Sequence, residues 1–185
     1  RLSFDVPAEI YSKDNVFIQF DGLDVFADVT LNGHKIISAD NMFRIWKADV
    51  KSILKEKDNT LEVYFHSTTR KGLELTKDSP YWFHAANDLS HIGGLFDKKI
   101  SMYMRKAPYN FGWDWGPVLP VSGITGDIFI ELRSDGKITD MKIRQKKNAD
   151  GSFTVSVSLE CDLYEGEKAE MSLVSPKGEE IKLKG

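Results

Sequence analysis

The feature that most constrains the fold of this chain is a strand pattern that runs directly into an Asn-Gly dipeptide. Apolar residues alternate with polar ones ahead of it, at Val25, Ala27, Val29 and Leu31. This period of two is typical of a strand with one buried face. Asn32 and Gly33 follow at once, and both residue types accept the positive φ angles of a two-residue hairpin turn. Because Ile36 and Ile37 then begin a second apolar segment, the region predicts an antiparallel β-hairpin.

The same alternation recurs along most of the chain. The predicted strands cover residues 2–6, 15–20, 43–46, 61–65, 100–104 and 128–132, followed by 138–144, 153–161 and 171–174. A short helix of one or two turns is predicted near residues 49–55, and the periodicity fades over residues 68–99, which predicts a long loop there. We therefore expect an all-β fold.

Composition and charge exclude several classes of partner. The 25 basic and 28 acidic residues give a formal net charge of −3, so no net basic field draws in nucleic acid or an anionic membrane. The basic run at residues 142–147 has glutamates nearby, which favours a solvated surface of mixed charge. No apolar run approaches the roughly 18 residues of a membrane span. The single cysteine, Cys161, is predicted to be a small buried hydrophobe.

The predicted loop over residues 68–99 contains His84, Asp88 and His91, which invites a metal interpretation. These residues lack a helix-supported ligand spacing and no cysteine joins them, whereas zinc sites use tighter ligand pairs. We therefore predict solvated loop histidines, no metal site and no cofactor.

The segment from Arg105 to Pro117 is the best candidate for a functional site. It reads Arg-Lys-Ala-Pro-Tyr-Asn-Phe-Gly-Trp-Asp-Trp-Gly-Pro. Its prolines remove backbone donors, and Gly112 and Gly116 permit backbone angles closed to other residues, so a shaped loop is predicted. Trp113 and Trp115, which flank Asp114, either anchor this loop in a core or line a concave site.

Sugar recognition is the chemistry that suits the Trp-Asp-Trp arrangement. A pyranose ring has an apolar C–H face that packs on an indole, and an ionised carboxylate such as Asp114 accepts hydrogen bonds from neighbouring hydroxyls. The alternative is that both indoles fill a core and that Asp114 caps a turn. Residue spacing alone leaves both interpretations open.

Four further segments precede this loop in a set order. They are Phe20-Asp-Gly-Leu-Asp24, Ala27-Asp-Val-Thr-Leu-Asn-Gly33, Ala39-Asp-Asn-Met-Phe43 and Asn59-Thr-Leu-Glu-Val-Tyr-Phe-His-Ser67. Together with the Trp-Asp-Trp-Gly loop and the following Val-Ser-Gly-Ile, they resemble the N-terminal sugar-binding domain of β-mannosidases in glycoside hydrolase family 2. The resemblance covers residues 1 to about 133. The Trp-Asp-Trp-Gly loop points most narrowly to the mannosidase branch.

The resemblance implies a jelly-roll-like (galactose-binding-domain-like) antiparallel sandwich over residues 1–133, without its first strands. Residues 134–185 are expected to begin an immunoglobulin-like β-sandwich that stops part-way, so the chain is expected to be a fragment. Thr125 and Gly126 depart from the family pattern, which usually has a tryptophan here near the junction between the two domains.

The resemblance also assigns roles to the loop. Trp113 and Asp114 are expected to bind a terminal β-mannose of a β-mannoside or manno-oligosaccharide, while Trp115, as an anchor from beneath, and Gly112, Gly116 and Arg105 support the loop. The two catalytic glutamates of the family's retaining mechanism lie on a (β/α)₈ barrel further along the parent chain. We therefore expect no catalytic residue here, an inactive isolated chain, and that barrel as its partner.

Two alternatives remain open from the sequence. The chain can be a stand-alone carbohydrate-binding or scaffold module without an enzymatic role. It can also belong to a family 2 enzyme that acts on another β-glycoside, such as a β-galactoside. A periplasmic or extracellular bacterial location is favoured over a lysosomal one.

Overall fold

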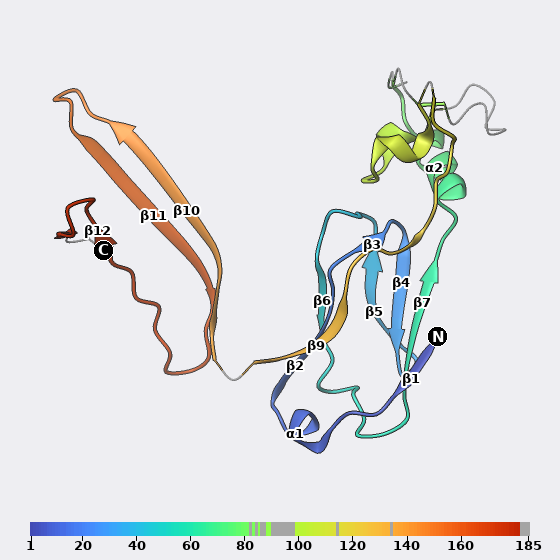
Figure 1. Cartoon of the computed structure of the whole chain (residues 1–185), viewed down its shortest axis with the longest axis horizontal. Helices are drawn as coiled ribbons and strands as arrows, with labels where there is room; N and C mark the ends of the chain where they lie inside the picture. The colour runs from blue at the N-terminus through green and yellow to red at the C-terminus, as the bar shows by residue number, and fades with distance from the viewer. Residues whose placement is uncertain are drawn as a thin grey trace. The chain divides into compact units, whose positions relative to one another are not determined.

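A computed structural model describes residues 1–81, 83, 85, 88–89, 99–113, 115–133 and 135–181. The chain divides into two compact units, residues 1–132 and 133–185, and each is described by itself. Figure 1 shows sheets in both units and helical segments in the first.

Two antiparallel sheets build the first unit. One has the strand order β1-β7-β4-β5 and the other the order β6-β2-β9. A short ladder, β3-β8, joins residues 23–24 to residues 123–124. The strands are β1 (Leu2–Phe4), β2 (Asn15–Phe20), β3 (Leu23–Asp24), β4 (Ala27–Leu31), β5 (His34–Ala39), β6 (Trp46–Asp49), β7 (Asn59–Phe65), β8 (Gly123–Ile124) and β9 (Ile128–Arg133).

The core lies between these two sheets. Alternate residues of β2 and β4 supply its centre, among them Ile18, Phe20, Val29 and Leu31, which are at most 2% exposed. Each strand thus presents one face to the core and one face to solvent, as the alternation predicts. The predicted all-β sandwich is confirmed.

The predicted hairpin is confirmed in detail. β4 pairs with β5, and the turn residues Asn32 and Gly33 have φ angles of 51° and 84°. β4 also pairs with β7, from Ala27 opposite Phe65 to Leu31 opposite Leu61. The hairpin therefore forms the middle and one edge of the four-stranded sheet.

The loop prediction for residues 68–99 is wrong at its start, where helix α2 (Thr68–Lys77) follows β7 directly. The Ser67 hydroxyl accepts a hydrogen bond from the Arg70 backbone N–H at 3.3 Å and caps the helix. Its two leucines, Leu73 and Leu75, lie two positions apart, so they do not show the three- to four-residue apolar spacing that predicts helices. A cap residue followed by helix-favouring Arg, Lys, Leu and Glu is the signal that could have found it.

Three other local predictions need correction. The predicted strand at residues 100–104 is a 3₁₀ helix, η2 (Ser101–Tyr103). The strand placed at residues 43–46 begins at Trp46 and continues to Asp49. The helix expected near residues 49–55 is only a turn, in which the Val50 carbonyl accepts hydrogen bonds from the N–H groups of Ile53 and Leu54 at 3.1 and 2.8 Å. The four-residue helix α1 (Ala8–Tyr11) was not predicted.

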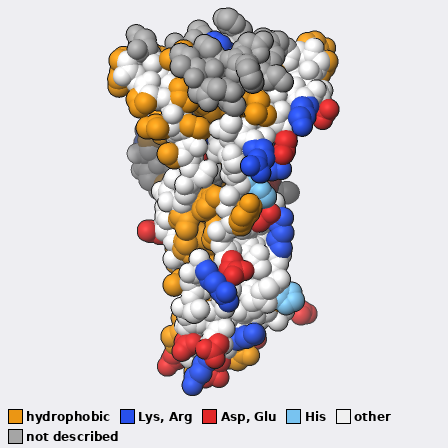
Figure 2. Space-filling model, turned by 90° about the vertical axis from the view of Figure 1, so that its right-hand side faces the viewer, with side chains coloured by type: hydrophobic (Ala, Val, Ile, Leu, Met, Phe, Trp, Pro, Cys, Tyr) orange, Lys and Arg blue, Asp and Glu red, His pale blue; other side chains and the backbone are white. Residues whose placement is uncertain are grey.

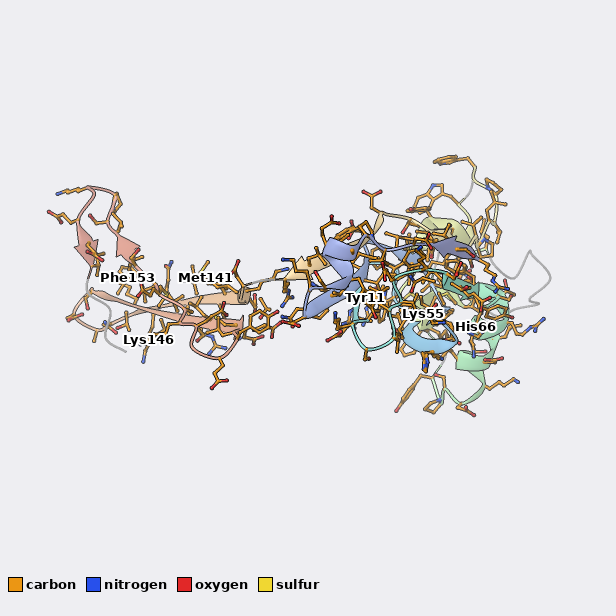
Figure 3. All side chains as sticks on the ribbon, turned by 90° about the horizontal axis from the view of Figure 1, so that it is seen from below. Tyr11, Lys55, His66, Met141, Lys146 and Phe153 are labelled. Carbon is orange, nitrogen blue, oxygen red and sulfur yellow. The ribbon has the colours of Figure 1, made fainter. Side chains whose placement is uncertain are left out.

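The second unit is built around one long antiparallel ribbon. β10 (Lys137–Lys147) pairs with β11 (Phe153–Asp162), and the short strands β12 (Leu173–Val174) and β13 (Glu180–Ile181) pair with each other. Met141, Lys146 and Phe153 all project from this ribbon (Figure 3). Cys161, predicted to be buried, is half-buried on β11 because the ribbon has few apolar neighbours. An immunoglobulin-like identity for residues 134–185 stays a prediction.

The face shown in Figure 2 carries Lys and Arg side chains close to Asp and Glu side chains, with hydrophobic groups between them. Neither sign of charge forms an extended field there, as expected for a chain with a formal net charge of −3.

Candidate functional site

The candidate loop begins with a 3₁₀ turn that anchors it in the first unit. This turn is η3 (Pro108–Phe111), and the Phe111 ring is fully buried. The Asn110 carbonyl accepts a hydrogen bond from the Leu119 N–H at 2.9 Å, which joins the two ends of the loop. Both contacts hold the intervening residues as one projecting segment.

Gly112 is the position where the loop needs a glycine. Its φ angle is 101°, and a Cβ atom there would lie 3.0 Å from Leu89 Cβ and from Val118 Cγ2. A larger residue would therefore meet both backbone strain and contact with two side chains. The chain can turn outward here only because this side chain is absent.

A buried ion pair fixes the strand side of the loop. Lys106 Nζ donates to Asp24 Oδ2, and the two side chains are 0% and 5% exposed. The same ammonium donates to the Val121 carbonyl at 2.8 Å, so one side chain links β3 to the far end of the loop. Among the described residues, Asp24 Oδ1 has no hydrogen-bond partner. Removing the ammonium would leave a buried carboxylate without compensation.

The tip of the loop is a tight reversal. The Trp113 N–H donates to the Gly116 carbonyl at 3.3 Å, and the Gly116 N–H donates to the Trp113 carbonyl at 3.2 Å. These two bonds bring Trp113 and Gly116 together and close the tip of the loop. Asp114, the predicted acceptor for sugar hydroxyls, lies outside the described residues.

Both indoles of the described loop face solvent to different degrees. Trp113 is 43% exposed and Trp115 is 85% exposed. In this chain Phe111, and not Trp115, occupies the buried position, and a role for Trp115 as an anchor of the loop stays a prediction. Trp113 and Trp115 together border one hollow rather than filling a core.

This hollow has a volume of about 500 Å³ and is largely apolar. It is lined by Tyr109, Asn110, Trp113, Trp115, Gly116, Pro117, Leu119 and Val121. Aromatic faces with a single carboxamide among them suit a ligand that has an apolar face and a few polar groups, as a sugar ring has. The hollow supplies the stacking surfaces for such a ligand.

Arg105 lies apart from this hollow. Its backbone carbonyl accepts a hydrogen bond from the Met42 N–H at 3.0 Å, and its backbone forms an isolated parallel β-bridge with Asn41. Its side chain is exposed and lines a different groove. Arg105 thus connects the base of the loop to residues 41–42. The structure brings Trp113, Trp115 and Gly116 together and does not bring the Arg105 side chain to them.

Sequence reasoning missed Asp24, Lys106 and Phe111 as the residues that hold the loop. The alternation marks Asp24 only as a neighbour of apolar Leu23 and Val25, and nothing local marks Lys106 as buried. Their pairing joins positions 82 residues apart, which residue spacing does not reveal.

The part of the chain that the structure describes contains no helix long and apolar enough to cross a membrane. Within the same residues, no group of three or more His, Cys, Asp or Glu side chains could hold a metal ion. Asp88 is buried, and its carboxylate accepts a hydrogen bond from the Ser101 backbone N–H at 2.9 Å. His84 and His91 lie outside the described residues.

Comparison with known families decides the identity of the first unit. The model of the glycosyl hydrolase 2 galactose-binding domain-like family matches residues 1–126. The chain belongs to this family. The matched range contains the whole candidate loop of this glycosyl hydrolase 2 domain, including both indoles and the Lys106–Asp24 pair.

Relatives of this glycosyl hydrolase 2 chain include fungal enzymes. It is 36% identical to beta-mannosidase B of Aspergillus flavus over 143 residues, and this match covers 76% of this chain and 16% of that protein. It is 37% identical over 144 residues to beta-mannosidase B of Emericella nidulans, with the same coverage of 76% and 16%. The predicted family is confirmed.

A solved structure agrees with these sequence comparisons. The beta-D-mannosidase from Dictyoglomus thermophilum matches with a TM-score of 0.69 and 31% identity, over 88% of this chain and 19% of that one. The glycosyl hydrolase 2 chain described here therefore spans less than a fifth of the length of each of these relatives.

Proposed function

We propose that the first unit is the sugar-binding domain of an exo-acting β-mannosidase and that its 105–121 loop forms one wall of the pocket for a terminal β-mannose. The observation that carries the proposal is the apolar hollow of about 500 Å³ that Trp113 and Trp115 line. Membership of the glycosyl hydrolase 2 family and the likeness to beta-mannosidases support the choice of sugar.

The side chains of the loop divide the work of recognition. The Trp113 indole packs against the C–H face of the mannose, which removes apolar area of both from water. The Asp114 carboxylate accepts charge-assisted hydrogen bonds from hydroxyls at the non-reducing end of the sugar. Because the loop is held by a buried ring and a buried ion pair, the Trp113 indole is positioned before the sugar arrives.

The chemistry itself belongs to the rest of the parent enzyme. A retaining glycosidase needs two carboxyl groups about 5–5.5 Å apart, one as acid/base and one as nucleophile. These are glutamates of a catalytic barrel that is the partner of this domain, and residues 134–185 begin the immunoglobulin-like domain between them. The isolated 185-residue chain therefore hydrolyses no glycoside.

Steady-state kinetics of the full-length parent test the proposal. Asp114→Ala strands sugar hydroxyls in a desolvated pocket, and each lost charged hydrogen bond of about 1.5–3 kcal/mol lowers kcat/KM by about ten- to a hundredfold. Trp113→Ala lowers kcat/KM as well. Asp14→Ala, an exposed carboxylate on the turn before β2, is the matched control and leaves kcat/KM unchanged.

Thermal unfolding of the same variants separates binding from folding. Lowered stability of Asp114→Ala with unchanged kcat/KM would show that the carboxylate only holds the loop, and the proposal would fail. Turnover of nitrophenyl β-mannoside by the isolated chain would contradict the assignment of both catalytic carboxyl groups to the barrel.

A further inference from the structure

A second concave region lies away from the Trp113 hollow, on the outer face of the four-stranded sheet. It consists of a pocket of about 750 Å³ and an adjoining one of about 370 Å³. The two share Phe26, Asp40 and Leu75 as lining residues, so they form one continuous groove. We call this region the α2 groove.

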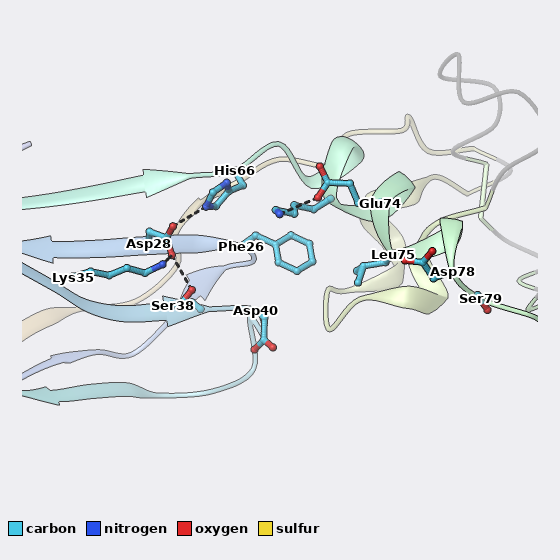
Figure 4. Close-up of a pocket in the computed structure, with 12 residues that line it drawn as sticks. Phe26, Asp28, Lys35, Ser38, Asp40, His66, Glu74, Leu75, Asp78 and Ser79 are labelled. Atoms are coloured by element: carbon cyan, nitrogen blue, oxygen red, sulfur yellow. Dashed lines mark hydrogen bonds and ion pairs between the residues drawn. The ribbon is translucent and has the colours of Figure 1, made fainter.

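Strand alternation and one helix build the α2 groove. The apolar side chains of β4 and β5 face the core, so their polar side chains point to the opposite face of the sheet. These polar side chains, together with His66 just after β7, form the floor of the groove. The wall is α2, which Figure 4 shows across the groove from Asp28 and His66, with Phe26 between them.

Close packing behind the helix fixes the position of this wall. A Cβ atom on Gly72 would lie 2.7 Å from Met104 Cε and 2.9 Å from Ile100 Cβ. The helix backbone therefore rests directly on residues 100–104, as only a glycine permits. Because Ile100 is fully buried, the wall rests on a fixed support.

The floor carries an ordered polar network centred on Asp28. One carboxylate oxygen accepts hydrogen bonds from Lys35 Nζ at 2.6 Å and Ser38 Oγ at 2.8 Å, and the other lies 3.0 Å from His66 Nε2. These donors hold the pKa of Asp28 well below its usual range, and the hydrogen bond from Lys35 has the largest effect. His66 also packs edge-on against Tyr64, with ring centroids 4.9 Å apart.

The charges around the groove alternate in sign. On the wall, Lys71 pairs with Glu74 at 2.9 Å, and on the floor Lys35 pairs with Asp28. Asp40 and Asp78 also line the groove, and among the described residues neither side chain has a hydrogen-bond or ion-pair partner. Two carboxylates are thus available to a ligand between two occupied ion pairs.

This arrangement selects for the chemistry of the ligand. The free carboxylates of Asp40 and Asp78 repel an anionic ligand, and the ammonium groups of Lys35 and Lys71 repel a polyamine. A hydroxyl group both donates and accepts, so a neutral polyhydroxylated chain satisfies both kinds of group. Phe26 and Leu75 offer apolar contact to the C–H faces of such a chain.

We propose that the α2 groove is a second carbohydrate site, separate from the Trp113 hollow, that binds a segment of a neutral oligosaccharide. Asp40 and Asp78 accept hydrogen bonds from the sugar hydroxyls, and the ammonium groups of Lys35 and Lys71 donate to the sugar oxygens. The site depends only on residues of this chain and does not require the catalytic barrel.

NMR titration of the whole chain tests the site with separate reporters for each region. The His66 ring resonances, assigned with His66→Gln, report on the groove, and the Trp113 and Trp115 indole N–H resonances report on the loop. Mannotetraose should shift the His66 resonances in a saturable way, with a Kd of about 1 mM or tighter. Spermidine and inorganic phosphate at equal concentration should not.

Variants assign the binding to the groove. The double variant Asp40→Asn, Asp78→Asn should raise the Kd read at His66 at least about tenfold, through loss of charged acceptors. Asp14→Asn, which removes an exposed carboxylate outside the groove, and Trp113→Ala should leave it unchanged. The proposal is overturned if mannotetraose shifts only the indole resonances, if it shifts none, or if spermidine or phosphate alone saturates the His66 shift.

Discussion

The side-chain amide of Asn32 donates a hydrogen bond to Asn59 Oδ1 at 2.9 Å and ties the tip of the β4–β5 hairpin to the first residue of β7. Asn32 Oδ1 accepts from the Thr60 backbone N–H at 2.9 Å, and its amide also donates to the Ile53 carbonyl at 2.8 Å. Asn59 is fully buried and bonds both the N–H and the carbonyl of Lys55. One pair of amides therefore joins three separate segments.

Replacing Asn59 should be costly for this reason. Asn59→Leu leaves the Asn32 amide and the Lys55 backbone groups without their partner, and we expect a loss of about 3 kcal/mol in the free energy of unfolding, measured with urea. Asn148→Ala removes a half-buried asparagine whose side-chain hydrogen bonds are exposed to solvent, and should cost about 1 kcal/mol or less. Equal losses in the two variants would contradict the role of burial.

The Lys106–Asp24 pair should show the asymmetry of a buried charge. Lys106→Met leaves the Asp24 carboxylate buried alone, which should lower the free energy of unfolding by about 3–5 kcal/mol. The double variant Lys106→Met, Asp24→Leu removes both charges and should recover much of that loss. Chemical denaturation of the single and double variants measures the difference. A double variant less stable than Lys106→Met would refute this account.

Gly72→Ala should destabilise the chain although alanine favours helices by about 1 kcal/mol over glycine. The new methyl group overlaps Ile100 and Met104, and we expect overpacking to cost about 1–3 kcal/mol. Thermal unfolding checks the sign of the change. Lys77→Ala, on an exposed face of the same helix, should change stability by no more than about 0.5 kcal/mol, and a stabilised Gly72→Ala would show that the helix does not rest on residues 100–104.

Acid should weaken the fold partly through Asp28. Its pKa lies well below the ordinary value of 3.8 in the folded state, chiefly because Lys35 and Ser38 donate hydrogen bonds to it. A carboxyl group with a lowered pKa stabilises the fold above its ordinary pKa, and this stabilisation disappears as the pH falls toward the folded value. The free energy of unfolding should therefore fall more steeply below about pH 5 in the parent chain than in Asp28→Asn. Parallel pH profiles would contradict this.

The loop should tolerate loss of one aromatic side chain and not of another. Trp115 is 85% exposed, so Trp115→Ser should leave the midpoint of thermal unfolding nearly unchanged, whereas Phe111→Ala empties a fully buried site and should cost about 3–5 kcal/mol. Differential scanning calorimetry compares them. A large loss from Trp115→Ser would show instead that this indole anchors the loop.

The local elements of the fold could be predicted where the sequence carries its own pattern. The alternation before Asn32-Gly33 determines the hairpin because the turn type and the buried face both depend on neighbouring residues. Helix α2 buries only Thr68 and Gly72 and could not be predicted from apolar spacing, since its position depends on the contact of Gly72 with Ile100, which is distant in sequence.

The candidate site could be predicted only in part for the same reason. The Trp-Asp-Trp spacing identifies the loop, yet which indole is buried depends on Phe111 and on the Lys106–Asp24 pair. The α2 groove has no sequence motif, because Asp28, Ser38 and His66 come together through the pairing of β4 with β5 and β7. Strand register, rather than spacing along the chain, creates that cluster.

The hairpin turn has a chemical consequence for the lifetime of the protein. In a flexible Asn-Gly dipeptide the glycine nitrogen attacks the asparagine side-chain carbon, forms a cyclic imide and releases ammonia, and hydrolysis then leaves aspartate or isoaspartate. Here three hydrogen bonds hold the Asn32 amide against residues 53–60. Deamidation at Asn32 therefore requires the hairpin tip to open. The rate at which the protein gains one negative charge during storage then reports how often the hairpin tip unfolds locally.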